Sequence, residues 1–222
     1  MGRETAAPLS LAILISGRGS NMLAIARACA EGRLAARVAV VLSDVPDAPG
    51  LAAARALGIP ADAVPYVPGP DRAAARRDFE TALRARLAAA PVDLVVLAGF
   101  MRVLSADFIE RFSGRILNIH PSLLPAYKGL HTHARVLEAG EREHGASVHY
   151  VTAALDDGPT VLQARVPVEP GDSPETLSAR VQRLEHIIYP QVIQWIAEGR
   201  LECKDGQAYF DGAPLREARQ LS

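Results

Sequence analysis

The sequence predicts an open α/β fold, a mostly parallel twisted sheet with helices on both faces and a small hairpin near the C-terminal end. Two observations carry this prediction. Short apolar runs alternate along the chain with longer helical segments, which is typical of a parallel sheet built from strand–helix units. The run Leu94–Ala98 is apolar at every position, as expected for a strand that is buried on both faces.

Turn and capping residues set the element boundaries in the first half of the chain. The strands expected there are Leu11–Ile15, Val38–Leu42, a short one around Val64, and Leu94–Ala98. A helix follows the first strand and reaches about Glu31. Pro49 begins a second helix, which stops at Gly58. Asp71 caps a third helix, in which apolar residues recur every four positions.

The second half is read in the same way. The strands expected there are Ile116–Ile119, Ala146–Val151, Val161–Val168, and two short ones around Leu201 and Tyr209. Ser105 caps a short helix, and another covers Thr132–Ala139. Ser173 caps a long amphipathic helix that Pro190 should kink or divide. The pair Asp205-Gly206 indicates a hairpin between the last two strands.

Composition excludes several classes of protein. The 222 residues are 49% hydrophobic and 22% charged, which is typical of a globular chain and excludes a mainly disordered one. A net charge of −1 gives no overall attraction for nucleic acid or an acidic membrane surface. Cys29 and Cys203 form no C-x-x-C motif, so we expect no redox or thiolate–metal chemistry. We interpret Met1–Ser10 as a short leader and residues 11–222 as a single domain, and we expect the chain in the cytoplasm.

A glycine-containing loop, Ser16–Asn21, joins the first strand to the first helix. Glycines let the backbone approach an anion closely, and the N–H groups of the first helical turn point toward it. The alternative is a plain turn in which Ser20 or Asn21 caps the helix. No Gly-Lys-Ser/Thr follows, and Met22 occupies the third small position of a dinucleotide-binding loop. A monophosphate therefore fits better than a pyrophosphate.

Two polar residues interrupt the apolar strand that ends before Pro121. Asn118 and His120 are two apart, so their side chains lie on one face at the end of an inner strand. Ligands bind at that edge of open α/β sheets, and an amide donor beside a histidine is suited to stabilising an oxyanion. The alternative is a buried hydrogen-bonded pair. The break in an apolar strand favours the functional interpretation.

Other charged residues carry weaker signals. Asp156 and Asp157 precede Gly-Pro and by themselves indicate a solvated turn, although an acid beside His120 would orient its ring. The close pair His131 and His133 has no HExxH or cysteine partner, so we expect no metal. The Ala/Arg-rich segment 72–86 is interpreted as a solvated helix face, from which Arg76 is able to reach a carboxylate ligand.

Six motifs together resemble one family. They are I-S-G-R-G-S-N at Ile15–Asn21, L-A-G-F-M-R-V-L at Leu97–Leu104, L-N-I-H-P-S-L-L-P at Leu117–Pro125, G-L-H-T-H at Gly129–His133, the Leu155–Pro159 turn, and R-V-Q-x-x-E-H at Arg180–His186. With these motifs, the chain resembles the phosphoribosylglycinamide formyltransferases, folate-dependent enzymes of purine biosynthesis, from Leu11 to about Leu201. The Asn-x-His-Pro-Ser block is shared with other formyl-folate enzymes. The G-S-N loop and Glu185 select this family among them.

The resemblance implies a Rossmann-like fold and a role for each matching residue. The implied catalytic group is Asn118, His120 and Asp156. The implied ribonucleotide site consists of Gly19, Ser20 and Asn21 for the 5′-phosphate, with Gln182 and Glu185 for the ribosyl-glycinamide. The implied folate site consists of Arg76, Met101, Arg102, Val103, Leu104, Asn118, Thr152, Ala153, Ala154, Leu155 and Asp156. The N-terminal half of the domain would bind the ribonucleotide, and the C-terminal half would bind folate and carry the catalysis.

The implied reaction moves the formyl group of 10-formyltetrahydrofolate, a cosubstrate, to the amine of 5-phosphoribosylglycinamide. No metal, nucleic acid or membrane takes part, and the chain would act as a monomer or homodimer. A deformylase that uses water as acceptor is one alternative. A tRNA formyltransferase would need a basic extension, which the net charge disfavours. A nucleotide-binding dehydrogenase using Gly17, Gly19 and Asp44 is a second class, but it leaves Asn118 and His120 unused.

Overall fold

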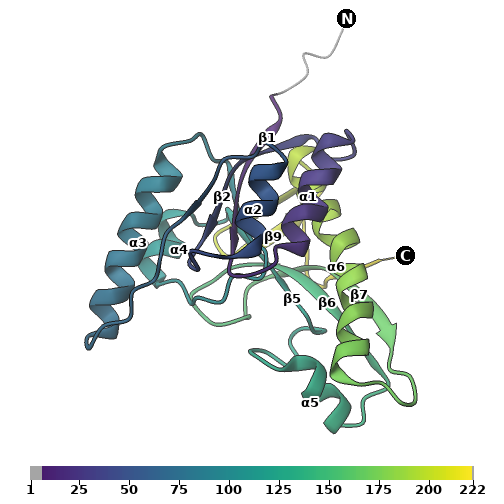
Figure 1. Cartoon of the computed structure of the whole chain (residues 1–222). Helices are drawn as coiled ribbons and strands as arrows, with labels where there is room; N and C mark the ends of the chain where they lie inside the picture. Colours follow the sequence, from purple (N-terminus) through teal and green to yellow (C-terminus); the bar gives the residue numbers. More distant parts are fainter. Residues whose placement is uncertain (1–6, 222) are drawn as a thin grey trace, which may run out of the picture.

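A single sheet of eight strands organises the computed structural model, which describes residues 7–221 (Figure 1). Its strands are β1 (Leu9–Ile15), β2 (Ala36–Ser43), β3 (Ala61–Ala63), β4 (Leu94–Leu97), β5 (Ile116–His120), β6 (Glu143–Tyr150), β7 (Thr160–Pro167) and β11 (Arg219–Gln220). They lie in the order β11-β7-β6-β5-β4-β1-β2-β3. The five neighbouring strands β5, β4, β1, β2 and β3 are parallel to one another, whereas β6 runs antiparallel to both of its neighbours. The predicted open, mostly parallel sheet is confirmed.

Helices cover both faces of this sheet, as predicted. They are α1 (Ser20–Ala30), α2 (Pro49–Ala56), α3 (Arg72–Ala88), α4 (Ala106–Arg111), α5 (Thr132–Glu138) and α6 (Pro174–Ala197). The alternation of side chains along β1 separates two cores. Leu11 and Ile13 pack with α1, α2, α5 and α6, whereas Ala12 and Leu14 pack with α3 and α4 on the opposite face (Figure 1). Within residues 7–221, no helix is long and apolar enough to cross a membrane.

The predicted C-terminal hairpin is present and is larger than expected. Strands β8 (Leu201–Lys204) and β9 (Gln207–Phe210) pair antiparallel, and β10 (Ala213–Pro214) adds a third strand. The chain then returns to the main sheet, where β11 pairs parallel with β7. Strands of two exposed residues carry no periodic pattern, so β10 and β11 had no signal in the sequence.

Several strand boundaries differ from the sequence prediction; β2 and β6, for example, begin at Ala36 and Glu143 rather than at Val38 and Ala146. The first strand begins at Leu9 rather than Leu11, because Leu9 and Ser10 pair with β2; part of the expected leader is therefore strand. Residues 1–6 of that leader lie outside the described residues. The strand expected around Val64 is instead β3, whose position is set by its pairing with Val41, Leu42 and Ser43 of β2.

Pro190 does not divide α6, so of the two expected effects, a kink or a division, the division is wrong. The helix continues through the proline to Ala197 as one element of 24 residues. Ile188, Tyr189, Val192 and Ile193 surround the proline in sequence, and all are fully buried in the core. Burial of these side chains, each worth about 1.5–3 kcal/mol, outweighs the one backbone hydrogen bond that proline cannot donate.

The strand order places a crevice beside β1. From β1 the chain moves outward through β2 and β3, then returns to the other side of β1 to form β4 and β5. The connections that leave β1 and β4 therefore run in opposite directions, and the loops beyond their carboxyl ends separate. In open α/β sheets such a reversal is where ligands bind.

Tyr189 of α6 ties this helix to the strands beneath the crevice. Its fully buried hydroxyl donates to the carbonyl oxygens of Leu97, at 2.9 Å, and Leu117, at 3.1 Å. Burial raises the pKa of Tyr189 well above its usual value, so the hydroxyl stays a donor. One side chain of α6 thereby holds the carboxyl end of β4 and the first half of β5 beneath the crevice.

We predict that Tyr189→Phe lowers the free energy of unfolding by about 1–3 kcal/mol, because two buried carbonyl groups lose a donor. Urea denaturation followed by circular dichroism measures the change. The matched control is Tyr209→Phe in β9, since the Tyr209 hydroxyl makes no hydrogen bond within the described residues. An equal loss in both variants would contradict the assigned role.

Candidate active site

A cavity of about 850 Å³ lies in the crevice, beyond the carboxyl ends of β1, β4 and β5. Sixteen of the predicted site residues line it: Gly19, Ser20, Asn21, Met101, Arg102, Val103, Leu104, Asn118, His120, Thr152, Ala153, Ala154, Leu155, Asp156, Gln182 and Glu185. The structure thus brings together segments from both halves of the chain. Arg76 is the one predicted site residue that does not line this cavity.

The pairing of β5 with β6 builds one wall of the cavity. Asn118 lies directly opposite His149 in the antiparallel register, and His120 lies opposite Ser147. The Asn118 amide nitrogen is 3.1 Å from Nε2 of His149, while Nδ1 of His149 is 2.9 Å from the Tyr150 carbonyl oxygen. A carbonyl only accepts, so Nδ1 carries the proton and Nε2 accepts from Asn118. The second amide hydrogen of Asn118 remains for a ligand.

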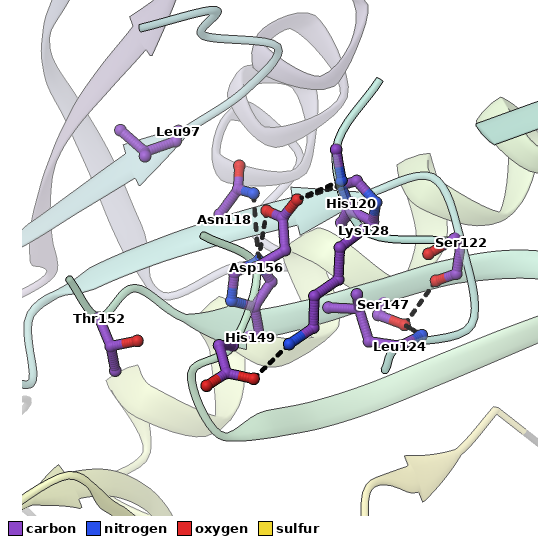
Figure 2. Close-up of polar contacts among 12 residues, drawn as sticks. Leu97, Asn118, His120, Ser122, Leu124, Lys128, Ser147, His149, Thr152 and Asp156 are labelled. Atoms are coloured by element: carbon purple, nitrogen blue, oxygen red, sulfur yellow. Dashed lines mark hydrogen bonds and ion pairs between the residues drawn. The ribbon is translucent and has the colours of Figure 1, made fainter. Parts of the chain in front are cut away.

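His149 is therefore a site residue that the sequence motifs did not single out. Its side chain faces Asn118 and Asp156 (Figure 2). Burial is the main reason that the pKa of His149 is lowered, which keeps the ring neutral and its Nε2 an acceptor. On the buried strand β6, Ser147 and His149 are two residues apart, which is the same spacing as that of Asn118 and His120. The sequence does not show that β5 and β6 are neighbours, so it did not connect the two pairs.

His120 lies between two oxygen atoms that accept hydrogen bonds. Its Nε2 is 3.0 Å from the Tyr127 carbonyl oxygen, and its Nδ1 is 3.4 Å from Oδ2 of Asp156 (Figure 2). Both the His120 and the Asp156 side chains are less than 10% exposed. The contact that the sequence left open is thus present. Acceptors on both sides suit an imidazolium, which donates from both nitrogens.

The loop after β6 holds Asp156 in place. Asp156 has a positive φ of 48°, a conformation that non-glycine residues adopt rarely and mostly at functional sites. Its Oδ2 accepts from the Gly129 backbone N–H at 2.9 Å. The neighbouring Asp157 forms an ion pair with Lys128, whose charge is thereby directed to this loop. These two contacts join the loop after β6 to the loop that follows β5.

At the other end of the cavity, the first turn of α1 meets α6. The N-cap of α1 is Gly19, with φ of 72°, and no side chain caps the helix. The alternative interpretation, a turn capped by Ser20 or Asn21, is therefore wrong. The first-turn N–H groups have no side-chain acceptor and are available to an anion. Gly50 of α2 packs against this loop, where a Cβ would lie 2.5 Å from a methyl carbon of Ile15.

Two polar pairs join α1 to α6 beside this turn. The Gln182 amide donates to the Ser20 hydroxyl at 3.0 Å, and the Asn21 amide donates to Oε2 of Glu185 at 2.8 Å. Burial raises the pKa of Glu185, and the hydrogen bond from Asn21 partly opposes this. Oδ1 of Asn21 is buried and has no partner among the described residues. A buried acceptor without a donor indicates a ligand that supplies one.

The loop after β4 forms the third side of the cavity. Ser16 accepts from the Met101 N–H at 2.8 Å and donates to Asp44, which joins this loop to the loop after β1. Arg102 donates from Nε to the same carboxylate at 2.7 Å and lies over the Tyr66 ring, 4.3 Å from its centroid. Asp44 is buried, so it holds Ser16 and Arg102 together as a fixed unit.

Within residues 7–221, no group of three or more His, Cys, Asp or Glu side chains is arranged so that it could hold a metal ion. Nδ1 of His133 is 2.9 Å from Nε2 of His144. Burial is the main cause that lowers the pKa of His144 to about 4, so this pair shares a hydrogen bond between neutral rings.

The comparisons with known proteins agree with this architecture. A family model described as formyl transferase matches residues 9–193, and the chain belongs to that family. The phosphoribosylglycinamide formyltransferases of Escherichia coli and Haemophilus influenzae are 48% and 45% identical to it, over 93% and 92% of this chain and 96% and 95% of theirs. A solved phosphoribosylglycinamide formyltransferase structure from Coxiella burnetii has a TM-score of 0.90 and 48% identity, covering 97% of this chain and all of that one. Within the formyl transferases, the chain belongs with the phosphoribosylglycinamide formyltransferases.

We predict that His149 titrates below the ordinary histidine value of 6.5 and keeps its proton on Nδ1 when neutral, because its ring is buried and faces the Tyr150 carbonyl. Histidine-selective ¹⁵N NMR over a pH series measures both properties. His131, which is exposed, serves as the reference ring in the same spectra. A titration of His149 at or above 6.5, or a proton on Nε2, would contradict the geometry.

Proposed function

We propose that this chain transfers the formyl group from N10 of 10-formyltetrahydrofolate to the amine of 5-phosphoribosylglycinamide. The product is formylglycinamide ribonucleotide, an intermediate of de novo purine biosynthesis. One observation carries the proposal: a single cavity has an uncapped helix N-terminus at one end and the Asn118–His120–Asp156 cluster on its wall. A substrate whose anionic group binds at the helix N-terminus would extend along the cavity to this polar cluster.

The ribonucleotide would bind along α1 and α6. The backbone N–H groups of the first turn of α1 would hold the 5′-phosphate, with the helix dipole favouring its negative charge. Glu185 would accept from the ribose hydroxyls. The unpartnered Oδ1 of Asn21 supports this placement, because the hydroxyl and amine groups of the substrate are donors.

The folate would bind between the loop after β4 and the loop after β6. Met101–Leu104 and Thr152–Asp156 are opposite parts of the same cavity lining, and they meet the catalytic cluster at Asn118 and Asp156. Backbone N–H and C=O groups of these segments would pair with the polar edge of the pterin. Arg76 stands apart from this pocket and would reach only the far end of the donor.

The reaction joins the two ligands at the wall of β5. The substrate amine attacks the formyl carbon, and the carbonyl oxygen gains negative charge as the tetrahedral intermediate forms. The remaining N–H of Asn118 and the cationic ring of His120 would stabilise this oxyanion. Collapse of the intermediate breaks the bond to N10, which takes a proton from His120. Asp156, acting through water, would remove the proton that the attacking nitrogen loses.

Two alternatives are separated by one set of measurements. A deformylase would release formate with water alone, so the release of formate from the donor is measured with and without the ribonucleotide acceptor. A nucleotide-binding dehydrogenase needs Asp44 at the nucleotide, but that carboxylate is buried and already bonds Ser16 and Arg102. Binding of NAD(H) should therefore be undetectable while a folate analogue binds. Formate release at an equal rate without the acceptor would refute the proposal.

The setting of the reaction stays a prediction. We propose that the enzyme works in the cytoplasm on small molecules alone, as a monomer or a homodimer, with neither nucleic acid nor membrane as a partner. The residues 11–222 would form one functional domain.

We predict that Glu185→Gln weakens binding of the ribonucleotide by roughly 10- to 100-fold in KM while kcat changes little. The carboxylate loses charge-assisted hydrogen bonds worth about 1.5–3 kcal/mol. The pKa of Glu185 is raised above the 4.5 of an ordinary glutamate. As the pH is lowered, the affinity of the wild-type chain should therefore begin to fall at a higher pH than protonation of an ordinary glutamate would cause. The variant should lack this pH dependence of affinity and keep only the part that comes from titration of the substrate phosphate. The control is Glu198→Gln at the far end of α6; an unchanged KM in Glu185→Gln would exclude the assignment.

We predict that His120→Ala lowers kcat by roughly 10²- to 10⁴-fold, because both the cationic group and the acid are removed. Asp156→Asn should also lower kcat. Since the two side chains act as one unit, the double variant should be little worse than the worse single variant. Calorimetric binding of a folate analogue shows whether each variant still holds its ligands. Multiplicative losses, or a near-normal kcat in His120→Ala, would contradict the mechanism.

A further inference from the structure

The loop between β5 and α5 has two halves that are held in different ways. Residues 122–126 are fixed from beneath by the buried Ser147 hydroxyl, which donates to the Ser122 carbonyl oxygen at 2.6 Å and accepts from the Leu124 N–H at 3.0 Å. Residues 127–130 make no backbone–backbone hydrogen bond within the part of the chain that the structure describes. Side chains must therefore hold the second half in place.

The backbone of residues 127–130 contacts the catalytic cluster directly. The Tyr127 carbonyl oxygen accepts from Nε2 of His120 at 3.0 Å, and the Gly129 N–H donates to Oδ2 of Asp156 at 2.9 Å. Gly129 and Leu130 also line the main cavity. The position of this segment therefore decides where two of the three proposed catalytic side chains point.

This segment has an uncommon backbone conformation. Tyr127, Gly129 and His131 have positive φ angles of 55°, 80° and 58°. Non-glycine residues keep such a conformation only where surrounding contacts fix it. The Tyr127 ring packs against the core, whereas Leu130 is 69% exposed. The part of the segment beyond Tyr127 therefore depends on hydrogen bonds from other side chains.

Arg135 of α5 supplies such bonds from outside the cavity, which it does not line. Its Nη1 donates to the carbonyl oxygens of Lys128, at 2.7 Å, and Leu130, at 3.3 Å. Its guanidinium carbon also lies 5.4 Å from the centroid of the Tyr127 ring. The ion pair of Lys128 with Asp157 is a second tie (Figure 2), but it is partly exposed and such pairs contribute little. One planar guanidinium thus makes three contacts with the segment at once.

We propose that Arg135 is a positioning residue for formyl transfer, which holds the backbone of residues 127–130 where it orients His120 and Asp156. This inference rests on the proposed function, because it needs these two side chains to be the reacting group. Since Arg135 does not line the cavity, its loss should act on the chemical step rather than on ligand binding. A small displacement of reacting groups is enough to lower a rate strongly.

The test is Arg135→Met, which keeps an apolar stem beside the Tyr127 ring and removes the charge and the donors. The single-turnover rate of formyl transfer, with enzyme in excess over the formyl donor, should fall roughly 3- to 30-fold. KM for each substrate should change by less than about twofold. Amide hydrogen exchange of residues 127–130 should become faster, because their backbone has lost its tie to α5. Wild-type affinity for a folate analogue shows that the variant is folded.

Arg115→Met is the matched control. The Arg115 guanidinium carbon lies 5.6 Å from the centroid of the Phe112 ring, its Nη2 donates to the Arg111 carbonyl oxygen at 3.2 Å, and it does not line the cavity. Its loss should leave the single-turnover rate unchanged. A normal rate or unchanged amide exchange in Arg135→Met, a loss found only in KM, or an equal fall in Arg115→Met would overturn the inference. Absence of formyl transfer in the wild-type chain would instead count against the proposed function, so the two failures are distinguishable.

Discussion

The antiparallel pairing of β5 with β6 is the constraint on which the active site depends. It sets Asn118 opposite His149 and His120 opposite Ser147, so that polar side chains from two inner strands meet where β5 ends. A slip of one residue would turn Asn118 and His120 toward the other face. The hydrogen bond between Asn118 and His149 then fixes which amide hydrogen faces the cavity. Asp156 follows β6 directly and closes on His120 from the same side.

The long helix α6 connects the core to the ligand site. Its buried face carries Tyr189, whose hydroxyl reaches the carbonyl groups of β4 and β5. Glu185, one turn earlier, and Gln182, two turns earlier, meet the start of α1. The same burial that anchors the helix desolvates Glu185 and raises its pKa. Stability and recognition are therefore coupled in one element, because Gln182, Glu185 and Tyr189 belong to the same continuous helical segment.

Buried charge organises the loops around the cavity. Asp44 holds Ser16 and Arg102, and through them the loops after β1 and β4, which bring the proposed ribonucleotide and folate sites together. Asp71 caps the start of α3 in the same way, by accepting from the N–H groups of Ala73 and Ala74. Carboxylates therefore fix both the loops and a helix start on this side of the sheet.

The sequence by itself determined the sheet class, most elements and the positions of Asn118, His120 and the Gly19 loop, because periodicity, caps and glycines act locally. It did not determine the strand pairing that joins His149 to Asn118, the approach of Asp156 to His120, or the meeting of α1 with α6, since these contacts join residues far apart along the chain. For the same reason it did not show that Pro190 would leave α6 undivided. Only tertiary packing weighs a lost hydrogen bond against buried area, and only the folded chain decides which charges remain free.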